Sequence, residues 1–154
     1  MTQPAFALAP ESPRQAAVIR LLDALDAYQS ALYPAESNHL LDVDALAASD
    51  VRFFVARLDG EAVGCGALRI DPAGWGELKR MFVSPEARGL KLGRRILDRI
   101  EEEARREGLD CLRLETGIHQ PEALGLYRSA GYVERDAFGD YSPDPLSVFM
   151  EKRL

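Results

Sequence analysis

The hydrophobic period of the sequence changes after residue 50, and this change limits the folds that the chain can adopt. Residues 12–33 repeat apolar side chains at helical spacing, whereas 51–58, 62–70 and 76–83 have the short apolar patterns of strands. Asp59-Gly60, a dipeptide typical of tight hairpin turns, separates the first two of these strands. Successive strands without intervening helices predict an antiparallel sheet.

The second half of the chain alternates helices with strands. Residues 89–107 carry an apolar stripe at helical spacing, 111–116 resemble a strand, and 121–130 form the next helix pattern. The last strands are expected at 132–138 and 147–154. Because 111–116 follows 76–83 through a helix, these two strands are expected to be parallel. The sequence predicts one α/β (α+β) domain over residues 1–154, with a mixed, mostly antiparallel sheet of six to seven strands and about four helices.

Capping residues indicate where the first helices begin. Ser12 is expected to cap the first helix, with Pro13 in its first turn and Gln15 completing a capping box. Pro34 ends this helix, and Asp42 is placed to cap a short second one.

Composition narrows the class of protein. The chain has 154 residues and a formal net charge of −6, which argues against nucleic acid as the main partner. No apolar run approaches the roughly 18–20 residues of a membrane span, and the N-terminus lacks the basic and apolar regions of a signal peptide. These features predict a cytoplasmic protein without a membrane partner.

Cysteine and histidine usage points away from metal and thiol chemistry. Cys65 and Cys111 each lie in an apolar strand pattern, so both are expected to be buried and inert. His39 and His119 are far apart and have no metal-ligand spacing. We therefore expect no metal site.

A basic, glycine-containing loop joins the third strand to the long helix. The stretch SPEARGLKLGRRIL places Arg88, Lys91, Arg94 and Arg95 close to a helix start, where the helix dipole disfavours positive charge. One interpretation is a solvated helix end that happens to be basic. The other is a cradle for a small polyphosphate, because amides and the helix dipole there point at bound phosphates.

At these residues the chain resembles the GNAT superfamily of acetyl-CoA-dependent N-acetyltransferases. That family carries Arg/Gln-x-x-Gly-x-Gly/Ala, and VSPEARGLKLG matches it at Arg88 and Gly93 but has Lys91 where the first motif glycine is usual. A second family signature is matched by QPEALGLYRSAGY, with Gln120 in place of the usual asparagine. PAESNHLL (34–41) and DYSPDPLSVFM (140–150) resemble one branch of the family.

The resemblance implies acetyl-CoA as cosubstrate and assigns residues to it. The strand before the loop would pair with the pantetheine arm, the loop amides would hold the pyrophosphate, and Gly89 and Gly93 would let the backbone approach the phosphates. The implied cofactor-binding residues are Met81, Phe82, Val83, Arg88, Gly89, Leu90, Lys91, Leu92, Gly93, Arg94, Gln120 and Tyr127.

Two catalytic residues are implied by the same resemblance. Glu77 falls where some members place a general base; the alternatives are a surface carboxylate paired with Lys79 or Arg80, and deprotonation of the amine through a water chain. Tyr127 falls where the family places a proton donor to the departing sulfur, although its helical spacing also suits a core residue. A thiolate is a weaker base than a phenolate, so Tyr127 is expected to donate a hydrogen bond or a proton.

The acceptor is expected to be a small primary amine or amino acid. Glu36, His39 and Tyr141 lie in polar segments that flank the acceptor side in this fold, and Lys79 or Arg80 is placed to meet an amino-acid carboxylate. Two alternatives stay open: acetylation of proteins or peptides, and a non-catalytic acyl-CoA-binding sensor. A homodimer is expected from the family alone.

Overall fold

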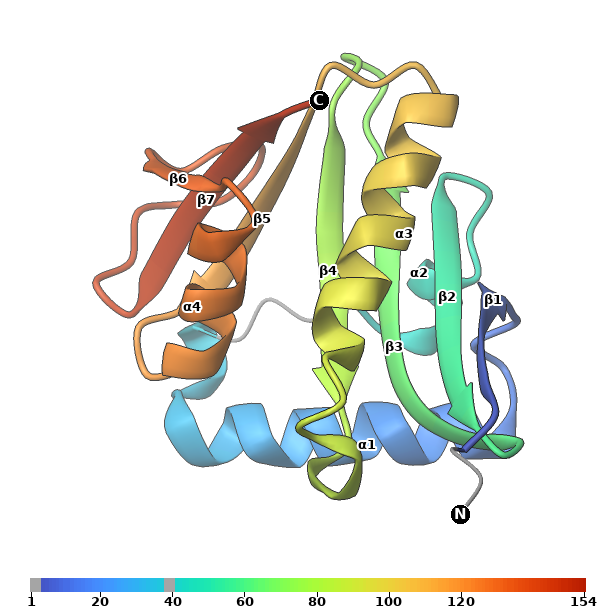
Figure 1. The fold of residues 1–154 in the computed structure, drawn as a ribbon. Helices are drawn as coiled ribbons and strands as arrows, with labels where there is room; N and C mark the ends of the chain where they lie inside the picture. Colours follow the sequence, from blue (N-terminus) through green and yellow to red (C-terminus); the bar gives the residue numbers. More distant parts are fainter. Residues whose placement is uncertain (1–3, 38–40) are drawn as a thin grey trace.

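The computed structural model describes residues 4–37 and 41–154. The strands are β1 (Phe6–Pro10), β2 (Val51–Leu58), β3 (Glu61–Ile70), β4 (Gly76–Val83), β5 (Cys111–Gly117), β6 (Val133–Arg135) and β7 (Ser147–Arg153). The helices are α1 (Ala16–Leu32), α2 (Val43–Leu46), α3 (Leu92–Arg106) and α4 (Pro121–Ser129), with 3₁₀ turns η1 (Ala35–Ser37) and η2 (Pro85–Ala87). The strands form one sheet in the order β1-β2-β3-β4-β5-β7-β6 (Figure 1). The predicted fold class is confirmed.

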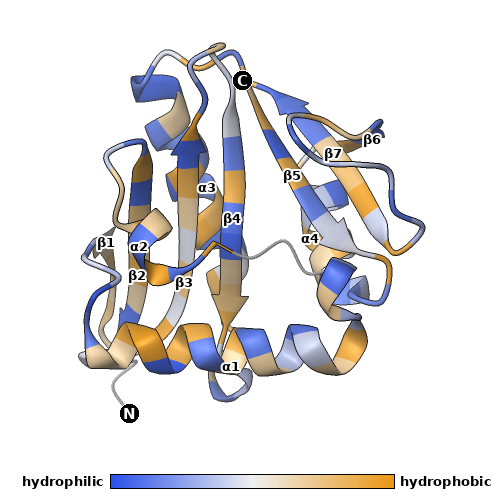
Figure 2. Cartoon of the chain, turned by 180° about the vertical axis from the view of Figure 1, so that it is seen from behind, coloured by the Kyte–Doolittle hydropathy of each residue, from blue (hydrophilic) through white to orange (hydrophobic). Residues whose placement is uncertain are grey.

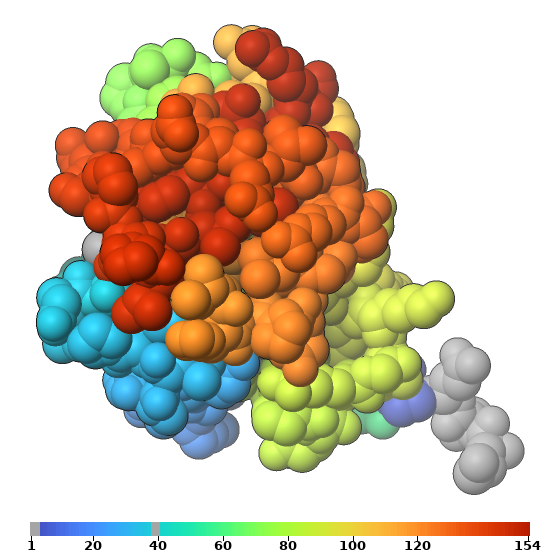
Figure 3. Space-filling view, turned by 90° about the vertical axis from the view of Figure 1, so that its left-hand side faces the viewer, coloured from blue at the N-terminus to red at the C-terminus, as the bar shows by residue number. Residues whose placement is uncertain are grey.

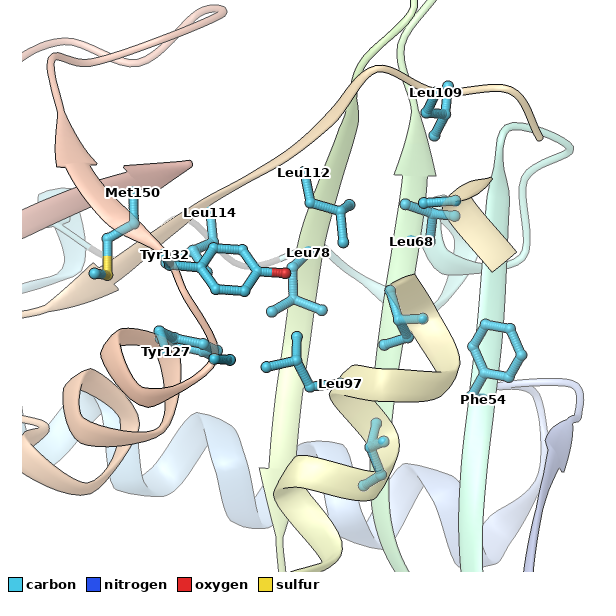
Figure 4. Packing of buried hydrophobic residues seen from close by; sticks show 14 of the residues in the cluster. Phe54, Leu68, Leu78, Leu97, Leu109, Leu112, Leu114, Tyr127, Tyr132 and Met150 are labelled. Carbon is cyan, nitrogen blue, oxygen red and sulfur yellow. The ribbon is translucent and has the colours of Figure 1, made fainter. Parts of the chain in front are cut away.

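Helices cover both faces of this sheet. Helices α3 and α4 lie on one face (Figure 1), and α1 and α2 lie on the other (Figure 2). Leucines of β3, β4 and β5 pack with α3 and with Tyr127 and Tyr132 at the α4 end of the sheet (Figure 4). A second cluster joins α1 and α2 to β2 and β3. In the described part of the chain, no helix is long and apolar enough to cross a membrane.

The β4–β5 junction is the feature of the sheet that positions the site. These strands are parallel, as predicted, but pair only at three positions, Gly76–Leu78 with Leu112–Leu114. Beyond them the two strands diverge, and α1 crosses below the gap (Figure 1). The edge of β4 that faces β5 therefore has backbone N–H and C=O groups with no β5 partner from Lys79 onward.

A bulge interrupts β4 within this divergent part. Cys65 pairs with Phe82 and Ala67 pairs with Lys79, so Gly66 faces both Arg80 and Met81. Arg80 adopts φ +57°, a left-handed conformation that is uncommon for a residue with a side chain. The extra residue re-aims the Arg80 side chain toward α1, where it pairs with Asp26.

The structure corrects several predicted boundaries at the N-terminal end. Strand β1 was not expected, because Phe6–Pro10 is short and rich in alanine and proline; it pairs with the edge of β2. The predicted cap at Ser12 is wrong: α1 begins at Ala16 with Gln15 as its N-cap, and the Gln15 side chain donates to the Ser12 carbonyl. Asp42 caps α2 as predicted, accepting from the Ala45 amide at 2.8 Å.

Two later boundaries also differ. Helix α3 starts at Leu92 and not at Gly89, because the chain from Gly89 to Lys91 uses positive φ angles that a helix excludes. Strand β6 covers only Val133–Arg135, since the following residues leave the sheet to form the segment that returns to β7.

Candidate active site

The predicted phosphate loop borders a crevice of about 340 Å³, here called the loop crevice. Its walls come from the end of β4, the loop 84–91, the start of α3 and one side of α4, with Leu25 and Tyr28 of α1 opposite. All the predicted cofactor-binding residues line it except Leu90 and Arg94. Leu90 is half exposed and Arg94 donates to Asp98 on the surface of α3.

The backbone of the loop explains its glycines and its one departure from the family pattern. Gly89 has φ +90°, and Lys91 has φ +58° at the N-cap of α3. A left-handed conformation costs a residue with a side chain about 1–2 kcal/mol, which accounts for glycine being usual at the position of Lys91. Gly93 faces Leu126 of α4: an added Cβ would lie 3.3 Å from a Leu126 methyl carbon.

A smaller cavity of about 80 Å³, the central cleft, continues from the loop crevice into the gap between β4 and β5. The two cavities share five lining residues: Leu25, Met81, Gln120, Ala123 and Tyr127. Tyr127 therefore lies where they join. Its side chain is buried, and burial, followed by the charge of Glu115, raises its pKa above the ordinary value for tyrosine. The hydroxyl is thus protonated at neutral pH.

Tyr33 and Gln120 close one wall of the central cleft. The Tyr33 hydroxyl donates to Gln120 Oε1 at 3.2 Å and accepts from the His119 amide at 3.1 Å, while Gln120 Oε1 also accepts from the Gly117 amide. A Cβ on Gly117 would lie 1.7 Å from the Tyr33 oxygen, so only glycine fits at this position. The end of α1 is thereby fixed against the turn between β5 and α4.

A third cavity of about 700 Å³, the outer pocket, lies on the α1 side of the sheet. Glu36, Lys79 and Tyr141, three of the predicted acceptor residues, line it together with Glu77. Lys79 also lines the central cleft and so borders both cavities. Figure 3 shows the red-orange segment before β7 against the cyan segment that follows α1. There, Ser37 Oγ of η1 donates to Asp144 Oδ2 at 2.7 Å. The fourth predicted acceptor residue, His39, lies outside the described residues.

Glu77 is buried within a network of polar groups. Its Oε1 accepts from Arg69 at 3.3 Å, and its Oε2 accepts from the Tyr141 hydroxyl and lies 3.4 Å from Lys79 Nζ. Lys79 in turn donates to the Tyr141 oxygen at 2.7 Å. Burial, then the charge of Glu77, raises the pKa of Tyr141. The predicted pairing of Glu77 with Lys79 is confirmed, but the alternative of a surface carboxylate is wrong because Glu77 is buried, and its second cation is Arg69 and not Arg80.

Sequence reasoning missed Glu115 altogether. It follows Leu114, the last β5 residue that pairs with β4, and it lines the central cleft with Tyr127 and Lys79. Its charge contributes to the raised pKa values of Tyr127 and Tyr33, so it lies within electrostatic reach of both. The available signal was its place after the alternating residues Leu112 and Leu114, at the carboxyl end of a strand parallel to its neighbour.

The cysteines are placed as predicted, both buried. Burial raises the pKa of the Cys65 thiol to about 12. Neither cysteine lines the loop crevice, the central cleft or the outer pocket. Within residues 4–37 and 41–154, no three His, Cys, Asp or Glu side chains gather as a metal site would require.

Comparison with known proteins places this site in a family. The profile of the Acetyltransferase (GNAT) family matches residues 18–132. The IAA acetyltransferase of Azospirillum brasilense is 57% identical over 152 residues, which cover 98% of this chain and 99% of that protein. The chain belongs to the GNAT family, and it is an N-acetyltransferase.

Solved structures agree on the fold. A structure described as an acyl-CoA N-acyltransferase from Klebsiella pneumoniae has a TM-score of 0.83 and 43% identity, with 97% of each chain covered. The PaiA N-acetyltransferase of Thermoplasma acidophilum, solved in complex with coenzyme A, has a TM-score of 0.75 at 18% identity, with 97% of this chain and 99% of that chain covered. At that identity the likeness concerns the fold alone.

Proposed function

We propose that this protein transfers an acetyl group directly from acetyl-CoA to the primary amine of a small molecule or amino acid. The observation that carries the proposal is the junction at Tyr127 between the loop crevice and the central cleft. One cavity presents a phosphate-type loop, the other is small and polar, and a protonated phenol lies between them.

The cofactor is proposed to lie in the loop crevice. The unpaired edge of Met81–Val83 supplies amide and carbonyl groups that match the two peptide-like groups of pantetheine. The amides from Arg88 to Arg94 receive the pyrophosphate at the start of α3, where the helix dipole favours negative charge. This arrangement brings the thioester to Tyr127 at the entrance of the central cleft.

Tyr127 is proposed to stabilise the departing sulfur. As the amine nitrogen bonds to the acetyl carbon and the C–S bond breaks, negative charge develops on sulfur and the phenol donates a hydrogen bond to it. The raised pKa of Tyr127 makes complete proton transfer to a thiolate costly, because the phenol is then a much weaker acid than the thiol. A hydrogen bond is therefore the role that this environment supports best.

Two carboxylates are candidates to accept the amine proton. Glu77, the predicted base, has both oxygens engaged by Arg69, Tyr141 and Lys79, and it reaches the central cleft only through these partners. Glu115 lines the central cleft itself. We propose Glu115 as the second candidate. Glu115→Gln and Glu77→Gln decide between them: the base variant loses most of kcat, and its activity recovers in part as pH rises and deprotonates the amine.

Neither cysteine is proposed to carry the acetyl group. The raised pKa of Cys65 leaves it as an inert thiol at neutral pH, and Cys111 lies on the far end of β5 from Gly117. Cys65→Ala and Cys111→Ala variants are expected to keep their turnover. Isolation of an acetyl-cysteine that forms and decays at the catalytic rate would contradict direct transfer.

The acceptor is proposed to be small because the central cleft is small. Its volume of about 80 Å³ suits an amine with a short substituent, and larger groups would extend past Lys79 into the outer pocket beside Glu36 and Tyr141. The hydrogen bond between Ser37 and Asp144 joins η1 to the segment before β7 at one side of that pocket, which leaves less room there for a peptide than for a small acceptor.

CoA release from acetyl-CoA in the presence of amines, amino acids and peptides tests the proposed function. Saturable release with small amines is the expected result. A preference for long peptides would favour protein acetylation. Tight acetyl-CoA binding with no release for any amine would favour a sensor of acyl-CoA.

A further inference from the structure

Arg80 is a buried cation in the middle of the sheet that the proposed chemistry does not use. Its side chain is 3% exposed, and the β4 bulge holds its backbone at φ +57°. Keeping a residue with a side chain in this conformation costs free energy, so the packing around it must impose it. The side chain is aimed at the α1 face and lines the central cleft.

Within residues 4–37 and 41–154, only one edge of the Arg80 guanidinium has a protein partner. Nη1 donates to Asp26 of α1, whose own side chain is about half exposed. Nε is buried and has no hydrogen-bond partner among the described residues. No hydrogen bond or ion pair joins Nη2 to any described residue either.

The unused donors form a recognisable binding edge. Nε–H and Nη2–H of a guanidinium are parallel, and they match two oxygens of a carboxylate or phosphonate. Leaving a buried charged donor unpaired is costly, and such groups in native proteins point to a partner. Because Nε has no exposed surface, an entering anion would engage Nη2 first and reach Nε after a side-chain shift.

The position of this edge indicates that it faces the acceptor and not the cofactor. Arg80 lines the central cleft but not the loop crevice, so it is on the acceptor side of Tyr127. Gln29 of α1 and Lys79 line the same cleft, and Glu115 lines it from β5. An acceptor whose anionic group is bound at Arg80 would thus have its amine in the same cavity as Tyr127 and the Glu115 carboxylate.

We propose that Arg80 binds an anionic oxygen group, carboxylate or phosphonate, on the acceptor amine, and so selects amino acids or aminoalkylphosphonates over simple amines. This inference rests on the proposed function and narrows its substrate class. Asp26 competes with the anion for the guanidinium and sets how tightly the anion is held.

The test compares acceptors that share an amine but differ in the anionic group: an alkylamine, the corresponding amino acid and the corresponding aminoalkylphosphonate. Arg80→Lys is expected to raise KM at least about tenfold for the acceptor whose anion is recognised, because a charge-assisted pair is lost, and to leave the alkylamine KM unchanged. The amino acid and the phosphonate together show which anion is preferred. The matched control is Arg57→Lys. Arg57 is a half-buried arginine of β2 that pairs with Glu11, and its replacement should leave the preference among the three acceptors unchanged.

Asp26→Asn provides a second test of the inference in case Arg80→Lys does not fold stably. It removes the competing charge from an exposed site and is expected to lower KM for the anionic acceptor by up to about fivefold, with no effect on the alkylamine. Equal KM changes for all three acceptors in both variants, or a change in Tm alone, would overturn this inference and assign Arg80 a structural role. Wild-type protein that acetylates no amine would overturn the proposed function, and this inference with it.

Discussion

The loop crevice and the outer pocket are built in opposite ways. The loop crevice is formed mainly by consecutive chain, from the end of β4 through the loop 84–91 into α3, and its proposed contacts are backbone amides. The outer pocket gathers side chains from β3, β4, η1 and the segment before β7. A site made of continuous backbone is specified by a short motif, whereas a site made of distant side chains is specified only by the fold. The loop crevice is therefore expected to tolerate side-chain changes that the outer pocket does not.

A change at Tyr127, where the loop crevice meets the central cleft, is expected to have the strongest effect. Tyr127→Phe removes the proposed hydrogen bond to sulfur and is expected to lower kcat by about 10²-fold with little change in acetyl-CoA affinity. Steady-state kinetics measure kcat, and calorimetric titration with acetyl-CoA in the absence of an amine measures the affinity. Tyr132→Phe is the matched control: it removes a buried hydroxyl that donates to Glu101 at 2.8 Å, so it should lower Tm but not kcat. Equal activity of wild type and Tyr127→Phe would remove Tyr127 from the reaction.

Arg88 tests whether any side chain matters on the cofactor side. Arg88→Ala is expected to weaken acetyl-CoA about tenfold or more and to leave S-acetylpantetheine, which lacks the phosphates, unaffected, because one charge-assisted phosphate contact is lost. Arg128→Ala, at an exposed position of α4 paired with Glu134, should change neither affinity. Equal weakening of both ligands would place Arg88 away from the pyrophosphate and make the loop a purely backbone site.

A substitution at Gly117 tests how closely the side chains around the central cleft must pack. Gly117→Ala forces Tyr33 away from its place against Gln120 and is expected to lower the free energy of unfolding by about 1–3 kcal/mol. Chemical denaturation measures it. Gly125→Ala is the control, because a Cβ there meets nothing within 4 Å and alanine favours the helix α4. An unchanged stability in Gly117→Ala would show that this wall of the cleft yields easily.

A change at Lys91 is expected to have the weakest effect, and it separates the contribution of the side-chain charge from that of the loop backbone. Lys91→Gly relieves the left-handed strain of about 1–2 kcal/mol and adds about 0.5–1 kcal/mol of backbone entropy cost, for a net gain between about 0 and 1.5 kcal/mol. Because the loop would bind phosphate through amides, acetyl-CoA affinity should fall less than in Arg88→Ala. A larger loss in Lys91→Gly would show that the Lys91 charge, and not the backbone, holds the phosphates.

The sequence predicted the elements of the fold better than their ends. The parallel pairing of β4 with β5, the hairpin at Asp59-Gly60 and the strand–loop–helix unit follow from local patterns and handedness rules. Strand β1 was missed because five residues that pair at a sheet edge carry little periodic signal. The N-cap of α1 moved from Ser12 to Gln15 because Gln15 bonds to the Ser12 carbonyl and to Glu11, an arrangement that propensities do not encode.

The candidate site also combines features that the sequence predicts with features that it does not. Loop residues such as Gly89 were predictable because their chemistry depends on backbone conformation. The partners of Glu77, the place of Glu115 in the central cleft and the unused edge of Arg80 were not, because each depends on a bulge or a strand divergence that no short motif records. Sequence reasoning named Glu77 and Lys79 correctly as neighbours but missed that Arg69 and Tyr141 complete their network.

The short β4–β5 ladder has a mechanical consequence. Strand pairing joins β1–β4 to β5–β7 at only three residue pairs. The sheet therefore consists of two half-sheets that are connected at one end and diverge toward the other. A pantetheine arm bonded along the open edge of β4 would take the place of the absent neighbouring strand and join the halves along the rest of their length. Bound acetyl-CoA would then stabilise the sheet as well as take part in the reaction. Its binding should slow amide hydrogen exchange in both half-sheets, including strands that it does not contact.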